Sequence, residues 1–487
     1  MAETKPDRLT ESLQRFTGIL SSAEIHQITA IQSAPLPTGI RINPLKAAPL
    51  TAIQDLADRY KWQLKPILFC DNAWLIESAE FPPGKTIEHR LGRYYLQDAA
   101  SMVPVSLFDF SQPDHVILDM AASPGGKTTH LVDRTLDRGF ILANDASQGR
   151  IPALRSVLAT WGAINLAVTN FPGEAYGSWF PETFDRVLLD APCSMENLRP
   201  SPSHPLRETT QSERLRLQER QVQLLISGLQ ALKIGGQLVY ATCSLAPEED
   251  EAVINQVVQA YPNAIRVENV SKNLPFKAPG LTAFETETYD PSLIQTLRLW
   301  PHTTGMSGFF CALLSKHNSI PASPEKPPSR KFSRTHLEPL NQAQQDQICD
   351  QISGNYHFDL CTLMEDMRVR LFSRHAGVFI IPEVYLENFS NLPFEFIGMS
   401  LGQWNGGQLQ PSHEFVSRFG SQFNAGFIQI DDDQVSQWIA GRDIRHPDTS
   451  LKPSGQYLLV LDGTGRNLGM GKLLPKRLRN MLPRISV

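Results

Sequence analysis

Apolar residues in the middle of the chain occur in short continuous runs, and stretches with helical spacing lie between these runs. The runs predict strands at Val116–Asp119, Phe140–Asp145, Ala163–Thr169, Asp185–Asp190, Gln237–Thr242 and Gly308–Leu314. Helical spacing is clearest at Thr128–Arg138, Ile151–Trp161 and Thr210–Leu232. Strands that alternate with helices in this way form a doubly wound, mostly parallel sheet. We therefore expect residues 106–316 to form one α/β domain.

The region before this domain, residues 1–105, has the pattern of a small mixed domain. Helices are expected at Glu11–Ile31 and Leu50–Tyr60, and strands at Gly39–Lys46, Leu64–Phe69 and Trp74–Ile76. The segment Gly92–Met102 is expected to lead into a helix that packs on the α/β domain. Asp98 and Ser101 in this segment could cap that helix or contact a ligand, and a cap is the more common role for these residue types.

The last third of the chain changes composition twice. Residues 317–340 are rich in Pro, Ser and charged residues, which is typical of a linker. Residues 341–487 are expected to form a β-rich module, with strands near Gly398–Gly402, Phe427–Ile430 and Tyr457–Leu461. From Arg466 to Val487 there are six Lys or Arg and no acid. This segment is either a solvated basic tail or a contact to an RNA backbone.

Composition and charge exclude several classes of protein. The chain has 487 residues, 41% of them apolar, and a net charge of −5, so bulk charge gives no sign of nucleic-acid binding. Its six cysteines include no CxxC pair, which argues against a zinc knuckle or a disulfide scaffold. We expect reduced thiols in a cytoplasmic protein without bound metal. The sequence contains no recognisable signal peptide and no apolar run long enough to span a bilayer.

A glycine turn follows the first predicted strand of the α/β domain. The chain reads Asp119-Met-Ala-Ala-Ser-Pro-Gly-Gly-Lys127 and then continues with helical spacing. Such a turn allows the backbone to approach a ligand, and the helix start offers free N–H groups. Asp145, at the end of the next strand, is placed to bind the two hydroxyls of a ribose. The same geometry serves NAD and S-adenosylmethionine, although the G-x-G-x-x-G spacing of dehydrogenases is missing.

Two cysteines make the interpretation more specific. Cys193 follows the strand that ends at Asp190, and Cys243 follows the strand that ends at Thr242. A single free cysteine is usually a small buried apolar residue. Two thiols at the ligand edge of a cofactor-binding sheet favour covalent catalysis instead. A thiolate that adds to carbon 6 of cytosine makes carbon 5 nucleophilic enough to accept a methyl group. Asp190 could hydrogen-bond the Watson–Crick edge of the base.

These motifs resemble the NOL/SUN family of RNA cytosine-C5 methyltransferases. The resemblance is carried by DMAASPGGKTTH, NDASQGR, LLDAPCS, IGGQLVYATCSLAPEEDE and GMSGFFCALLSK, in this order and spacing. IRINPLK and LGRYYLQDAASM resemble the family's N-terminal extension. LGMGKLLPKRLRNMLPR resembles the end of a PUA-type RNA-binding domain. The resemblance implies an α/β, Rossmann-like, S-adenosylmethionine-dependent core over residues 106–316. It also implies an α+β RNA-recognition extension over 1–105 and a PUA-like module over 341–487.

The resemblance also implies a role for each residue that matches a motif. Cys243 would be the nucleophile, Cys193 would assist release of the methylated product, and Asp190 would contact both donor and cytosine. Asp119 would support the glycine loop. The implied S-adenosylmethionine site comprises Ala121, Ala122, Ser123, Pro124, Gly125, Gly126 and Lys127 around the methionine part, Asp145 and Arg150 at the ribose, Asn170 near the adenine, and Asp190. Lys127 is also a candidate for the positive charge that would lower the pKa of Cys243.

Two departures from the family pattern affect the expected site. The family continues Pro-Cys-Ser with Gly-Glu-Gly, whereas this chain has Met195-Glu196-Asn197, so the loop beside the cytosine is expected to change shape. Asn170 stands where an acid is usual, although its carbonyl can still accept from the adenine amino group.

The functional expectation is methylation of a cytosine in RNA, most simply small-subunit ribosomal RNA, by a monomer. Three alternatives stay open at this point: a transfer RNA methyltransferase, an RNA-binding assembly factor whose catalysis has decayed, and, more remotely, a nicotinamide dehydrogenase. The decayed factor is motivated by Met195 and Asn197. The dehydrogenase would leave both strand-end cysteines without a role. The sequence does not specify which cytosine is the target.

Overall fold

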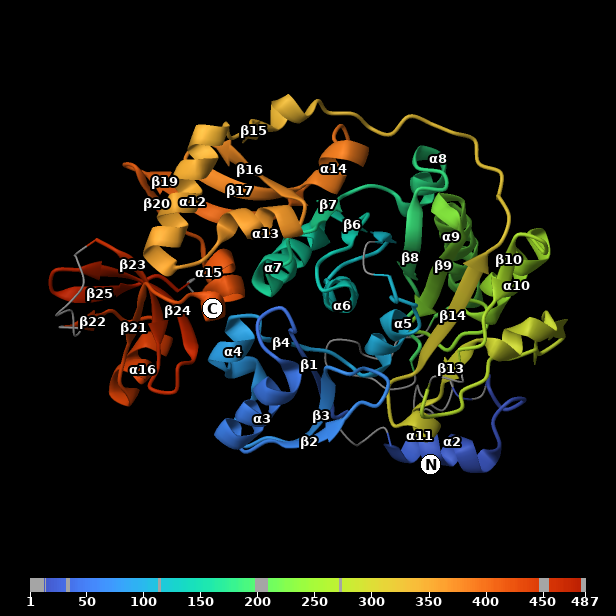
Figure 1. Ribbon diagram of the computed structural model, residues 1–487. Coiled ribbons are helices and arrows are strands. Elements are labelled where there is room, and N and C mark those ends of the chain that lie inside the picture. The colour runs from blue at the N-terminus through green and yellow to red at the C-terminus, as the bar shows by residue number, and fades with distance from the viewer. Residues whose placement is uncertain are drawn as a thin grey trace.

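A nine-stranded mixed sheet forms the centre of the computed structural model, which describes residues 13, 15–31, 36–112, 115–197, 209–270, 274–445 and 455–482. The strand order is β10-β14-β9-β8-β5-β6-β7-β18, with β13 paired to β14. Strands β9, β8, β5, β6 and β7 run parallel, and β14 is antiparallel to β9. In Figure 1, β8, β9 and β14 of this sheet lie on the right, the N-terminal elements lie below, and the two C-terminal sheets lie at the upper left and left.

The elements of this sheet confirm the predicted alternation of strands and helices. The strands are β5 (Val116–Asp119), β6 (Phe140–Asn144), β7 (Leu166–Thr169), β8 (Phe184–Asp190), β9 (Leu232–Thr242), β10 (Ile265–Val267), β13 (Leu297–Leu299) and β14 (Phe309–Lys316). The main helices are α6 (Gly126–Thr135), α7 (Ile151–Trp161), α9 (Gln211–Ala231) and α10 (Glu251–Ala260). The central residues of the strands are fully buried, since helices cover the faces of the sheet. The carboxyl ends of the parallel strands meet at one edge.

The N-terminal module, residues 13–99, has a four-stranded antiparallel sheet in the order β2-β3-β1-β4. Its elements are β1 (Thr38–Ile42), α3 (Pro49–Tyr60), β2 (Gln63–Pro66), β3 (Ala73–Ser78), α4 (Ile87–Arg90) and β4 (Tyr94–Leu96). The predicted helix over Glu11–Ile31 is confirmed for Ser22–Ile31, which forms α2, and is wrong for residues 15–21, because α2 begins only at Ser22. Ser21 and Glu24 cap this start: the Ser21 N–H donates to the Glu24 carboxylate at 2.8 Å. Residues 11, 12 and 14 of the predicted helix lie outside the described residues.

Three buried polar side chains of the IRINPLK segment join the N-terminal module to the central sheet. Arg41 is 0% exposed, pairs with Asp133 of α6, and donates to the Gly126 carbonyl at 3.0 Å. Asn43 donates to the carbonyls of Gly92 and Trp161, both at 2.9 Å. The alternation of apolar and polar residues predicts a half-exposed strand here. In the structure, both faces of β1 are covered, so the polar positions became contacts between modules.

The sequence predicts one β-rich module after the linker. The described residues between 338 and 482 contain two five-stranded sheets. The middle module has the order β15-β16-β17-β19-β20 and the terminal module the order β21-β23-β24-β25-β22. The middle module comprises β15 (Glu338–Pro339), α12 (Gln342–Tyr356), α13 (Leu360–Asp366), β16 (Val369–Arg374), β17 (Gly377–Pro382), α14 (Glu383–Asn388), β19 (Met399–Asn405), β20 (Gln408–Pro411) and α15 (His413–Phe419). The terminal module comprises β21 (Phe427–Gln429), α16 (Asp432–Ile439), β22 (Ile444–Arg445), β23 (Tyr457–Leu461), β24 (Asn467–Leu474) and β25 (Arg477–Asn480).

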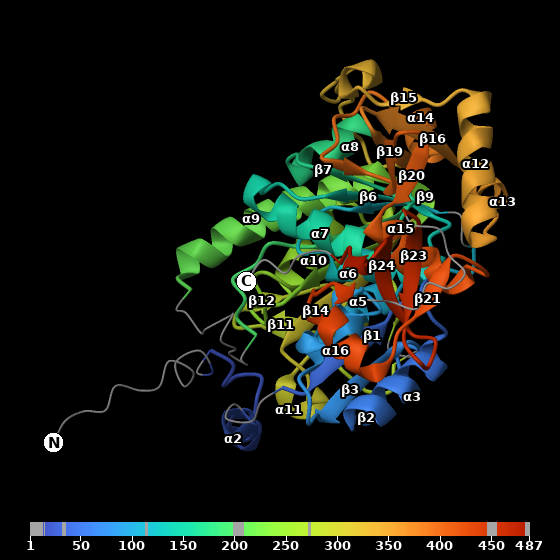
Figure 2. The same cartoon turned by 90° about the vertical axis from the view of Figure 1, so that its left-hand side faces the viewer.

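The middle module is attached to the central sheet directly. Strand β18 (Phe396–Ile397) pairs with β7 and so extends the central sheet. The segment 317–340 crosses the molecule largely without regular structure (Figure 1), and the Glu325 N–H donates to the Ser178 carbonyl at 2.9 Å. In the turned view of Figure 2, β23 and β24 lie between the middle module above and the N-terminal module below.

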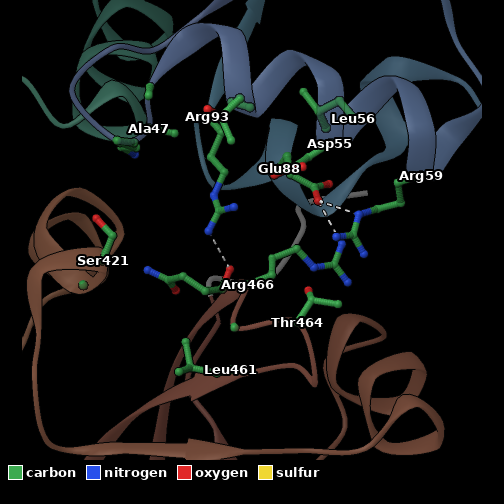
Figure 3. A pocket seen from close by; sticks show the side chains of 17 residues that line it. Ala47, Asp55, Leu56, Arg59, Glu88, Arg93, Ser421, Leu461, Thr464 and Arg466 are labelled. Atoms are coloured by element: carbon green, nitrogen blue, oxygen red, sulfur yellow. Dashed lines mark hydrogen bonds and ion pairs between the residues drawn. The ribbon is translucent and has the colours of Figure 1, made fainter.

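Charged contacts tie the terminal module to the N-terminal module. Arg466 donates to Glu88 at 2.8 Å, and Arg93 donates to the Asn467 carbonyl at 3.1 Å, beside a cavity of about 610 Å³ (Figure 3). The described part of the basic segment from Arg466 onward is therefore no free tail, because it forms β24 and β25. Lys46 is buried where three modules meet and donates to Leu91, Thr160 and Ser417, each at 2.7 Å.

Two of the six cysteines are not reduced thiols. Cys349 of α12 and Cys361 of α13 form a disulfide, so the prediction of free thiols is wrong for this pair. Their Cα atoms lie 6.1 Å apart, within the ordinary range for a disulfide. The other four cysteines, including Cys193 and Cys243, are free. Within the described part of the chain, no helix combines the length and apolar composition needed to cross a membrane.

The buried Arg41–Asp133 pair allows a stability prediction. Arg41→Met should lower the free energy of unfolding by about 3–5 kcal/mol, because Asp133 would keep its buried charge without the partner. Urea unfolding measures this loss. The control is Arg370→Met, which removes an exposed pair with Glu383 and should cost less than about 1 kcal/mol. Equal losses in the two variants would contradict the anchoring role.

Candidate active site

The predicted glycine turn lies between β5 and α6 at the carboxyl edge of the sheet. Gly125 has a φ of 112°, a left-handed conformation that favours glycine. A Cβ on Gly126 would lie 2.9 Å from a ring carbon of Tyr95, so the N-terminal module approaches this turn closely. Helix α6 starts at Gly126 without a side-chain cap, so its first N–H groups lack the usual side-chain acceptor. The turn therefore offers backbone donors to a ligand.

The side chain of Asp119 stabilises the glycine turn. It is buried at the end of β5 and accepts from the Thr128 hydroxyl at 2.7 Å. Burial raises the pKa of Asp119 to about 7, against the lowering effect of that hydrogen bond. This contact joins the strand before the turn to the helix after it.

The predicted ribose residues lie together at the ends of β6 and β7. The Asp145 carboxylate accepts from the Ser123 N–H at 3.1 Å and from the Ser147 N–H at 2.9 Å. Arg150 lies 3.6 Å from the same carboxylate and donates to the Ser123 carbonyl. The Asn170 amide donates to the Asp145 carbonyl at 2.7 Å. Asp145 therefore fastens the glycine turn to the next strand, and its role towards a ribose stays a prediction.

Cys193 and Cys243 meet across the gap between the loops that follow β8 and β9. Their sulfur atoms are 3.3 Å apart. The neighbouring backbone links the loops too, because the Ala191 N–H donates to the Ala241 carbonyl at 2.8 Å. The hydrogen bond with Cys243, together with burial, raises the pKa of Cys193 well above its usual value. Cys193 therefore keeps its proton at neutral pH and can donate it to the Cys243 sulfur.

A partly buried ion pair lines the same cavity as Cys243. Lys127 of α6 donates to the Asp190 carboxylate at 2.7 Å. Burial lowers the pKa of Lys127, but the charge of Asp190, and more weakly that of Cys243, outweighs burial and the net pKa is raised. Asp190 thus holds the ammonium group in its charged form, and the role of Lys127 towards the Cys243 thiol stays a prediction.

A cavity of about 660 Å³ brings most of these groups together. From the central domain, its wall includes Ala121, Ala122, Ser123, Pro124, Gly126, Lys127, Asp190, Asn197 and Cys243. From the N-terminal module it includes Thr38, Tyr95, Gln97 and Asp98, and Ser101 follows just after this module. Gly125, Asp145, Arg150, Asn170 and Cys193 are not among the residues that line this cavity. Asp98 is also the predicted cap, since its carboxylate accepts from the Ala100 N–H at 3.0 Å.

The loop that departs from the family pattern lies next to Cys193. Met195 has a φ of 64°, a region that glycine enters without strain and that other residues rarely adopt. The Asn197 carbonyl accepts from the Gly308 N–H at 3.1 Å, which fixes the loop against β14. A methionine therefore occupies a left-handed backbone position in this loop.

Sequence reasoning missed the residues that support the two cysteine loops. Glu249, Gln221 and the serines that follow the two cysteines form a buried cluster under the thiols. The signal was the acidic run Pro247-Glu-Glu-Asp-Glu251 after the second cysteine motif, which does not itself reveal which acid turns inward. Among the described residues, no group of three or more His, Cys, Asp or Glu is placed to hold a metal ion.

Comparison with known proteins gives matches along most of the chain. Residues 107–315 match the family model of the 16S rRNA methyltransferase RsmB/F. Residues 9–99 match the N-terminal domain of 16S rRNA methyltransferase RsmF, and residues 426–485 match the PUA domain of methyltransferase RsmF. The PUA match thus falls on the terminal module and leaves out the middle module.

Two curated relatives have the name ribosomal RNA small subunit methyltransferase F. The protein from Erwinia tasmaniensis is 31% identical over 483 residues, covering 98% of this chain and 96% of its own. The protein from Vibrio cholerae is 32% identical over 453 residues, covering 92% and 91%.

Two solved structures from Pyrococcus horikoshii are similar in fold. A methyltransferase homologue has a TM-score of 0.56 and 28% identity, covering 64% of this chain and 100% of its own. NSun6 has a TM-score of 0.53 and 19% identity, covering 65% and 99%, which supports the fold alone.

The raised pKa of Asp119 allows a prediction about pH. Between about pH 4 and pH 7, the folded state retains a proton that the unfolded chain has lost, so the free energy of unfolding falls as pH rises. Asp119→Asn lacks this titration. We measure the free energy of unfolding in urea between about pH 4 and pH 7. It should fall less for Asp119→Asn than for the wild type, and the difference between the two falls should reach up to about 4 kcal/mol. If the free energy of unfolding depends on pH in the same way for both proteins, the raised pKa of Asp119 is contradicted.

Proposed function

The chain belongs to the ribosomal RNA small subunit methyltransferase F family, and on this premise we propose that it methylates carbon 5 of a cytosine in small-subunit ribosomal RNA. The methyl donor proposed is S-adenosylmethionine. One observation carries the chemical part of the proposal: two thiols lie 3.3 Å apart beside a cavity that the glycine turn also lines. A single nucleophile would explain addition to the base, whereas the second thiol supplies a group for the release step.

The glycine turn and the strand ends fit the proposed donor. Residues 121–124, Gly126 and Lys127 would lie along its methionine part, where the uncapped start of α6 offers N–H donors. Asp145 and Arg150 would hold the ribose, and the Asn170 carbonyl would accept from the adenine. When bound, the donor supplies an electrophilic methyl group. The residues of this chain must place the cytosine against it.

Cys243 is the proposed nucleophile because, of the two thiols, it alone lines the cavity. Its thiolate would add to carbon 6 of the cytosine, which makes carbon 5 able to attack a methyl group. Lys127, which also lines the cavity, would place its positive charge near the reacting groups, and Asp190 would accept a hydrogen bond from the edge of the base. After methyl transfer, water takes up the carbon-5 proton, the electron pair of that C–H bond re-forms the double bond between carbons 5 and 6, and Cys243 leaves carbon 6 as a thiolate. Cys193, which is protonated before this step, would donate its proton to the departing sulfur and regain one from water.

The RNA must present the cytosine outside its stack, because the thiol lies within a cavity. Residues of the N-terminal module line the same cavity as the thiol, so this module would contact the RNA around the target base. The match of the terminal module to a PUA domain supports a second RNA contact there. A protein that modifies bacterial ribosomal RNA in this way would work in the cytoplasm, and we propose that it does so as a monomer.

The remaining alternatives make different predictions. A transfer RNA methyltransferase would modify purified transfer RNA in preference to the small ribosomal subunit, although the relatives' name favours the ribosomal substrate. A decayed assembly factor would bind RNA without turnover. The substituted loop that motivates this second alternative keeps a left-handed turn at Met195, and both thiols stay in contact.

Substitution of the two cysteines tests the proposed roles. Cys243→Ala should abolish transfer of labelled methyl groups to small-subunit RNA, because no thiolate can add to the base. Cys193→Ala should instead accumulate a covalent protein–RNA adduct, visible as a shifted band on a denaturing gel, because addition remains possible while release is slowed. The control is Cys311→Ala, which removes a buried thiol from β14 outside the cavity wall and should keep methyl transfer.

Two results would overturn these roles. Full methyl transfer by Cys243→Ala would exclude covalent catalysis through this thiol. Absence of an adduct in Cys193→Ala, with normal turnover, would exclude its role in release. Parallel reactions with transfer RNA decide between the two substrate classes.

A further inference from the structure

We propose that Glu249 is a positioning residue that holds the two cysteine loops together and so sets the distance between the thiols of Cys193 and Cys243. Its consequence for catalysis rests on the proposed function, but the structural claim does not. Glu249 follows Cys243 by six residues in the turn that leads into α10, and it is fully buried. No part of the proposed chemistry uses its carboxylate directly.

Both oxygen atoms of the Glu249 carboxylate bind the residues that follow the cysteines. One oxygen accepts from the Ser244 hydroxyl at 3.0 Å and also from the Ser194 hydroxyl. The other accepts from the Ser194 backbone N–H at 2.8 Å. The two serine hydroxyls are themselves 3.2 Å apart. A single carboxylate thus bridges the positions immediately after Cys193 and Cys243.

Neighbouring groups hold this carboxylate in place. The Gln221 amide of α9 donates to Glu249 at 3.1 Å and to the Pro192 carbonyl, just before Cys193, at 2.9 Å. The Tyr240 hydroxyl of β9 donates to the Glu249 carbonyl at 2.6 Å. Side chain and backbone of Glu249 are therefore fixed from two further elements, so the bridge has little freedom to shift.

A carboxylate is suited to this position because it accepts hydrogen bonds only. Its partners are a backbone N–H, two hydroxyls and an amide, all of which can donate. Burial raises the pKa of Glu249, while each of these four hydrogen bonds favours the charged form. Removing the carboxylate would leave these buried donors without their acceptor, and the two loops would lose their shared partner.

The bridge matters for release of the product. If Cys193 acts on the adduct formed at Cys243, its thiol must stay within contact distance of that sulfur. Hydrogen bonds under the loops can maintain this distance while the cavity side remains open to RNA. Without Glu249, addition to the base would still be possible, but the release group would be displaced.

Mild oxidation measures the proximity of the thiols without any assumption about activity. Diamide takes up two hydrogens from a thiol pair and leaves one S–S bond, and the Cys193–Cys243 product is identified by mass spectrometry of peptides. Glu249→Ala should form this bond on the order of tenfold more slowly than the wild type, given the usual cost of unsatisfied buried groups. Glu249→Gln retains one acceptor oxygen, so its rate of disulfide formation should lie between those of Glu249→Ala and the wild type.

The matched control is Asp250→Asn, which removes a buried carboxylate from the same turn. Asp250 binds Thr242 and Arg298 instead of Ser194. The Asp250→Asn variant should be less stable than the wild type, yet its Cys193–Cys243 bond should form at nearly the wild-type rate. Wild-type cross-linking in Glu249→Ala, or equal slowing in Asp250→Asn, would overturn the proposal. If Glu249→Ala does not fold, the double variant Ser194→Ala with Ser244→Ala takes its place, with the same slowing expected.

A second measurement connects the bridge to catalysis. Under methylation conditions, Glu249→Ala should accumulate covalent RNA adduct relative to methylated product, as is expected for Cys193→Ala. If the wild-type protein methylates no RNA, the proposed function fails while the cross-linking result still decides the role of Glu249. If cross-linking slows and the adduct does not accumulate in an active variant, the positioning role in release is wrong.

Discussion

The register between β8 and β9 is the constraint on which the site depends. Asp190 at the end of β8 lies opposite Ala241 near the end of β9, so the loops that follow carry Cys193 and Cys243 towards each other. A shift by one residue would turn alternate side chains to the other face of the sheet. The thiol contact of 3.3 Å is thus a consequence of strand pairing, which the Glu249 bridge then refines. The ion pair of Lys127 and Asp190 connects α6 to the end of β8 at the same edge of the sheet.

Buried charge also joins the modules around this edge. Arg41 connects the N-terminal module to the helix that follows the glycine turn, and Lys46 connects three modules at one point. Such groups are expensive to bury unless they are paired, so they favour one arrangement of the modules over others. Part of the wall of the cavity that Cys243 lines comes from the N-terminal module. Correct docking of that module is therefore a condition for a complete site.

Much of this could be predicted from local patterns. Apolar runs that end in Asp119, Asp190 or Thr242 predicted the strands within a few residues, because buried parallel strands need continuous apolar sequence. The roles predicted for the glycine turn and for the two cysteines were based on their places at strand ends. Local patterns could not reveal that Arg41 is buried, since the same alternation fits an exposed strand. They also could not choose Glu249 over its acidic neighbours, or pair β18 with β7, because these outcomes depend on contacts between distant segments.

The central claim is that Cys243, and not Cys193, bonds to the target cytosine. It is tested most directly with small-subunit RNA that carries 5-fluorocytosine, since fluorine cannot leave as the carbon-5 proton does and the adduct persists. Digestion of the trapped complex and mass spectrometry identify the modified cysteine. If Cys243 is the nucleophile, the nucleotide will be found on the peptide that contains Cys243. A nucleotide on the peptide that contains Cys193, or active methylation without any adduct, would contradict it.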